Sequence, residues 1–137
     1  MDAPRHQTWI RAAILLGGVY CLIGIVFALP ADHVRAWRLA AWLVSGVVYV
    51  AHIGYEHFRL RSAPRLAALH VATAVAVGAL GLAVAGMLHS LSIAPVIRPA
   101  WLLALVLWPA FTALPAFVGA LVAGAVLSRL PRRSDAE

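Results

Sequence analysis

The chain has 137 residues, of which 64% are hydrophobic and only 12% are charged. Soluble domains carry about 25% charged residues, so this composition excludes a chain whose surface is solvated by water alone. The net charge of +6 comes from eleven arginines, with no lysine, that lie at the ends of apolar runs. A basic patch for nucleic acid is therefore not expected, and the composition predicts an all-α integral membrane protein.

Four apolar runs are each long enough to cross a hydrocarbon layer of ~30 Å, which takes about 20 residues. They cover residues 9–29, 37–58, 65–89 and 100–128, and a short polar tail follows at 129–137. Short connections rich in proline join them, so neighbouring helices should run in opposite directions. We expect a single domain over residues 1–137, an antiparallel four-helix transmembrane bundle.

Small residues indicate where helices approach each other closely. The first and third runs carry such residues at helical spacing, and these are the packing candidates: Gly17, Gly24, Ala74, Gly78, Gly81 and Ala85. One interpretation is packing within the bundle, and the other is a seam between copies of the chain.

The second run carries the most informative pattern. At about 100° per residue, one face of this helix gathers a polar stripe, made of Arg38, Ser45, Tyr49, His52 and Glu56. Polar groups within a membrane are costly unless they face the bundle interior or water. We therefore expect the stripe to point inward.

His52 and Glu56 are one helical turn apart, and His70 lies at a similar depth after the connection to the third run. The sequence leaves four interpretations of this cluster open. It would bind a b-type haem between the two histidines, bind a divalent metal, or relay protons or cations. Alternatively it is only the polar end of a helix, with Glu56 paired to Arg59 or Arg61.

The fourth run contains Pro109 and Pro115. Proline removes a backbone donor and its ring clashes with the preceding turn. These residues predict a kinked helix.

Arginine counts predict the orientation, because loops on the cytoplasmic side are enriched in positive charge. One side carries eight arginines: Arg5, Arg11, Arg59, Arg61, Arg65, Arg129, Arg132 and Arg133. The other side carries three, Arg35, Arg38 and Arg98. Both termini should be cytoplasmic, and we expect the inner membrane of a bacterium.

No nucleophile motif or phosphate loop is present, and Cys21 is the single cysteine, so an enzyme is not favoured. The leading interpretation is a non-enzymatic membrane protein that acts as a subunit of a membrane complex or as a homo-oligomer, with lipid and other membrane subunits as its partners. The alternatives are a haem- or metal-binding electron-transfer protein that uses His52 and His70, and a small transporter or channel that uses Ser45, His52 and Glu56.

Overall fold

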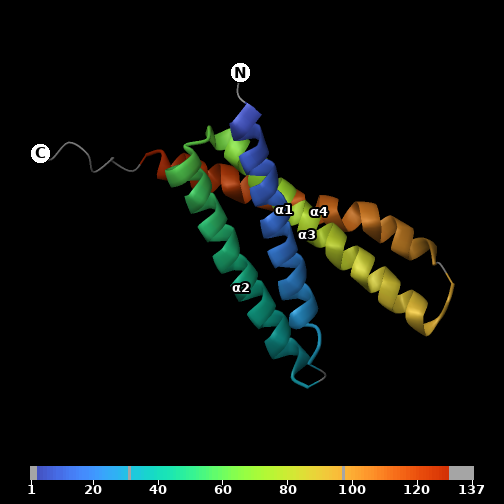
Figure 1. Ribbon diagram of the computed structural model, residues 1–137. Coiled ribbons are helices and arrows are strands. Elements are labelled where there is room, and N and C mark those ends of the chain that lie inside the picture. The colour runs from blue at the N-terminus through green and yellow to red at the C-terminus, as the bar shows by residue number, and fades with distance from the viewer. Residues whose placement is uncertain (1–2, 31, 97, 130–137) are drawn as a thin grey trace, which may run out of the picture.

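The computed structural model describes the backbone of residues 3–30, 32–96 and 98–129, and the side chains of these ranges from Thr8 onward. Four long helices account for almost all of it: α1 (Ala3–Val26), α2 (Val34–Tyr55), α3 (Pro64–Ile93) and α4 (Pro99–Leu127). A short π-helical segment, η1 (Glu56–Leu60), continues α2 (Figure 1). Residues 130–137 of the predicted tail, with Arg132 and Arg133, and the side chain of Arg5 lie outside the described part.

The all-helical prediction is confirmed, because all four helices are long and apolar enough to cross a membrane and the described residues form no strand. The largest difference in boundaries is at the start of α1, which begins at Ala3 rather than at residue 9. The next largest is at the end of α3, which we expected to stop at residue 89. It continues to Ile93 and ends at Ala94, whose backbone is extended. Ala94 precedes Pro95, and a residue before proline is pushed out of the helical region. The helix is therefore ended by Pro95, and the serines that precede it remain helical.

α3 and α4 lie side by side and run in opposite directions (Figure 1). The ring of Trp101 lies against Gly86 near one end of this pair, and Gly124 lies against Pro64 at the other. α4 remains a continuous helix through Pro109 and Pro115. The kink at these residues and the antiparallel order of all four helices across a membrane stay predictions.

α1 crosses α3 through the small residues noted above (Figure 1). A Cβ atom on Gly78 would lie 2.6 Å from Cβ of Tyr20 and 3.0 Å from the carbonyl oxygen of Gly17. A Cβ on Gly17 would lie 2.6 Å from the side chain of Val77. The two backbones therefore meet closely because neither glycine has a side chain.

α2 contacts the rest of the molecule mainly near its C-terminal end. Ile53 joins Ala68, Val71 and Ala120 in a buried cluster, and Tyr49 packs against it. Toward its N-terminal end α2 leans away from α3 and α4 (Figure 1). Most side chains in the N-terminal half of α2 are accordingly exposed.

Candidate functional site

The site is built where α2 changes into a π-helical turn. In η1 the backbone N–H of Arg61 donates to the carbonyl of Glu56, five residues earlier, and Ser62 N–H donates to the same oxygen at 3.2 Å. Arg61 then adopts a left-handed conformation, with φ of 49°, and ends the segment. Such π-helical turns are rare and occur frequently at functional sites. Here the turn begins with Glu56.

Glu56 is fully buried, with an exposed fraction of 0%. The Nδ1–H of His70, on α3, donates to both of its carboxylate oxygens, at 3.1 and 3.2 Å. His52, one turn earlier on α2, places Nε2 3.9 Å from Oε1 of Glu56. The structure therefore brings the three residues together, with the carboxylate touching one imidazole and facing the other.

His52 differs from His70 in its surroundings. His52 is 2% exposed, and neither of its ring nitrogens has a hydrogen-bond partner. Buried polar atoms are nearly always hydrogen-bonded, so two ring nitrogens without a partner require an explanation. The His70 side chain is 15% exposed, and the Trp9 ring of α1 stacks on it with 4.6 Å between ring centroids. The cluster thus runs from a sealed histidine, through a sealed carboxylate, to a histidine near the surface.

The interpretation of a plain helix end paired with arginine does not fit this geometry. In the described part of the chain Glu56 forms ion pairs with His52 and His70 only. Arg59 and Arg61 are exposed. The carboxylate is therefore turned into the protein, away from the arginines that follow it in the sequence.

The cluster does not fit a haem either. Oε1 of Glu56 lies 3.9 Å from His52 Nε2 and 3.1 Å from His70 Nδ1, so the carboxylate fills the place between the imidazoles that an iron and its macrocycle would take. A metal site is not supported, because no three His, Cys, Asp or Glu side chains within the described ranges are arranged to hold an ion. The carboxylate oxygens of Glu56 and Nδ1 of His70 face each other, so they do not converge on a point where a metal ion could bind.

A groove of about 570 Å³ lies beside the cluster, among all four helices. Tyr49 and Ser45 of the polar stripe line it, whereas Arg38, at the far end of the stripe, is exposed and takes no part. The Tyr49 hydroxyl donates to the carbonyl of Ala116 at 2.6 Å. It has room because Gly119 lacks a side chain, since a Cβ there would lie 2.7 Å from the hydroxyl oxygen. Tyr49 thus joins α2 to α4 between the groove and His52.

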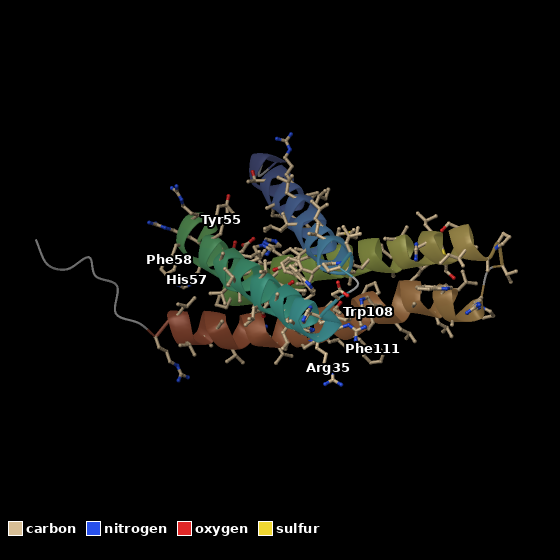
Figure 2. All side chains as sticks on the ribbon, turned by 90° about the horizontal axis from the view of Figure 1, so that it is seen from below. Arg35, Tyr55, His57, Phe58, Trp108 and Phe111 are labelled. Atoms are coloured by element: carbon tan, nitrogen blue, oxygen red, sulfur yellow. The ribbon has the colours of Figure 1, made fainter. Side chains whose placement is uncertain are left out.

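Aromatic residues that the sequence analysis did not select form much of this site. Trp9 covers His70, and Tyr20 lines the groove with a buried hydroxyl that has no partner. Trp42 and Trp108 also line the groove, and Figure 2 shows Trp108 and Phe111 extending from α4. One signal was present in the sequence: both tryptophans lie well inside apolar runs, although tryptophan prefers the membrane surface.

Of the small residues expected to pack helices, Gly17, Gly24, Ala74, Gly78 and Gly81 lie between α1 and α3. Ala85 is half-buried further along α3. The surface proposed as a seam between copies is therefore largely occupied by contacts within one chain. Comparison with family models, curated proteins and solved structures finds no match to this chain.

Proposed function

We propose that this is a small integral membrane protein whose His52–Glu56–His70 cluster carries protons, as part of a proton-linked transporter or channel. One observation carries the proposal: a fully buried carboxylate lies between two histidines, and the inner histidine has no hydrogen-bond partner on either nitrogen. Ionisable groups within a membrane are costly and mark proton or ion pathways by default.

The chemistry of a single transfer follows from the order of the groups. His70 takes up a proton at Nε2 from the exposed side and passes its Nδ1 proton to Oε1 of Glu56. Glu56 is already hydrogen-bonded to His70 Nδ1. Glu56 then passes the proton to His52 Nε2, once the 3.9 Å gap closes by about 1 Å to hydrogen-bond length, and His52 releases one from Nδ1, which returns all three groups to their starting charge state. Histidine suits this role because its ordinary pKa lies near neutrality.

The surroundings favour a defined route. α4 carries no ionisable side chain over its whole length, and the charged neighbours of the cluster on η1 and α3, Arg59 and Arg65, are exposed. The cluster is thus the ionisable path between the groove and the arginine-rich end. The arginine counts support placing that end, and both termini, in the cytoplasm of a bacterial inner-membrane protein. Protease access to tags on either terminus from the cytoplasmic side alone tests this orientation.

The test is proton flux. The purified chain is reconstituted into liposomes that contain a pH-sensitive dye, and a potassium diffusion potential is imposed with valinomycin. Protein-containing vesicles should change internal pH faster than empty ones, and Glu56→Gln, which keeps the shape of the side chain, should lower the protein-dependent rate at least tenfold. Asp32→Asn, which removes an exposed carboxylate, is the matched control and should leave the rate unchanged.

A variant that fails to fold is recognised by gel filtration and circular dichroism, and His70→Gln then provides the second test of the same relay. Wild-type vesicles that conduct no faster than empty ones would contradict the proposal. So would full flux in correctly folded Glu56→Gln.

A role as a membrane subunit or homo-oligomer is a second candidate, and one observation favours it. The N-terminal half of α2 exposes large apolar side chains, with Trp42 79% and Leu43 72% exposed. Trp42 lies eight residues into α2, about 12 Å from its start. A tryptophan at that depth is better matched by a protein surface than by lipid tails, and the mass of the protein in detergent separates the two candidates.

A further inference from the structure

The groove beside the cluster differs chemically from an ordinary gap between helices. It is lined by five aromatic residues, Tyr20, Trp42, Tyr49, Trp108 and Phe111, and by small residues that form a low floor, including Gly46 and Ala79. No charged residue lines it. Its volume of about 570 Å³ falls in the usual range for small-molecule sites. An occupant should therefore be neutral, and flat enough to lie against rings.

The hydrogen-bonding groups of the groove are mostly unused donors. The buried hydroxyl of Tyr20 has no partner. Trp42, Trp108 and Ser45 form no side-chain hydrogen bond within the described part of the chain. By contrast, the hydroxyls of Tyr49 and Thr112 in the same wall donate hydrogen bonds to backbone carbonyls. An indole N–H donates only, whereas a hydroxyl both donates and accepts, so the groove offers more donors than its own groups use.

The depth of these groups strengthens the point. Trp108 lies nine residues into α4, about 14 Å from its start, close to the depth of Trp42 on α2. Water is scarce at this depth, and each unsatisfied polar group in hydrocarbon is costly. A bound molecule with acceptor oxygens would satisfy these donors, and lipid tails would not.

We propose that the groove binds a neutral, lipid-soluble ring compound with carbonyl oxygens, and that the Tyr20 hydroxyl, which is buried in the wall, turns to donate a hydrogen bond to one of them. The ring lies between the aromatic side chains of α2 and α4, and its substituents extend into the lipid through the open side of the groove. This site does not rest on the proton relay, because Glu56 and His52 do not line the groove.

The experiment uses a matched pair of probes. Duroquinone has a methylated ring with two carbonyl oxygens, and durene has the same methyl pattern without the oxygens. Calorimetric titration of the full chain in mild detergent should show duroquinone binding at least tenfold more tightly than durene. Tyr20→Phe should weaken the binding of duroquinone at least fivefold and leave the affinity for durene unchanged. Tyr55→Phe, an exposed tyrosine outside the groove, should change neither affinity.

A second variant tests the place rather than the hydrogen bond. A Cβ on Gly46 meets nothing within 4 Å, and Gly46 lines the groove, so Gly46→Leu should fold normally and weaken both probes. Gly18 is equally open but lies outside the groove, and Gly18→Leu is its control. Glu56→Gln should bind duroquinone as the wild type does, which separates this site from the relay. Equal binding of the two probes to the wild type, unaltered duroquinone affinity in Tyr20→Phe, or unaltered binding in Gly46→Leu would overturn the proposal.

Discussion

The two ends of α2 behave as if they belonged to different helices. Near its C-terminal end, His52, Ile53 and Glu56 are 2%, 6% and 0% exposed. Near its N-terminal end, Leu39 and Trp42 are 65% and 79% exposed, and the helix leans away from α3 and α4. Figure 2 shows the same helix from below, with Arg35 at one end and Tyr55 at the other. Hydrophobicity does not separate the two ends, since both are rich in apolar residues.

What separates them is the presence of specific bonds. In lipid an apolar side chain gains little by leaving a lipid tail for another helix, so close packing and hydrogen bonds decide which surfaces meet. The C-terminal half of α2 has both, because Tyr49 and Glu56 form hydrogen bonds and Ile53 packs in the buried cluster. Among the described residues the N-terminal half forms no hydrogen bond to another helix, its ring contact is that of Trp37 with Phe27, and the groove lies on that side. A few polar residues thus determine both where α2 docks and where the molecule stays open.

The largest expected effect follows from removing the partner of the buried carboxylate. His70→Leu leaves Glu56 buried without its hydrogen-bond donor, and breaking a buried pair in this way costs about 3 kcal/mol or more. The free energy of unfolding, measured by titration with sodium dodecyl sulfate from mild detergent, should fall accordingly. The control is His89→Leu, on the same helix but exposed. Equal effects of the two substitutions would show that the cluster does not stabilise the packing of α2 against α3.

A smaller loss is expected at the α1–α3 crossing, which does not involve α2. A Cβ on Gly78 would approach Tyr20 Cβ to 2.6 Å, so Gly78→Val should force the helices apart and cost about 1–3 kcal/mol. Gly18→Val is the control, because a Cβ there meets nothing within 4 Å. The same detergent titration measures both. If the two variants unfolded at the same midpoint, close approach at Gly78 would not be stabilising this pair.

The residues of the cluster were predictable because their positions depend on local rules. Helical spacing places His52 beside Glu56, and a short connection returns the chain to His70 at the same depth. The four helices themselves were predictable from length and apolarity. In both cases the information lies within one helix or one turn.

The groove and its aromatic lining could not be predicted in the same way. Which apolar face meets a neighbour, and which meets lipid, is not encoded by periodicity when residues are apolar all round the helix. The position of Trp9 over His70 and the open side of α2 depend on the crossing of α1 and α3, which glycine contacts set over many residues. The π-helical turn at Glu56 likewise has no simple sequence signal.

The smallest effect should come from the single bond that joins α2 to α4. Tyr49→Phe removes the hydroxyl that donates to Ala116 at 2.6 Å and keeps the ring packed against the core cluster. Interhelical hydrogen bonds in membranes contribute about 0.6 kcal/mol on average and at most about 1.7, so the free energy of unfolding should fall by roughly that average. Tyr55→Phe is the control, because that ring is exposed. Since Tyr49 stands where the docked half of α2 meets the open half, spin labels on α2 and α4 should report a broader distance distribution in Tyr49→Phe. An unchanged distribution, together with unchanged stability, would mean that His52 and Glu56 alone fix the point where α2 turns away from its neighbours.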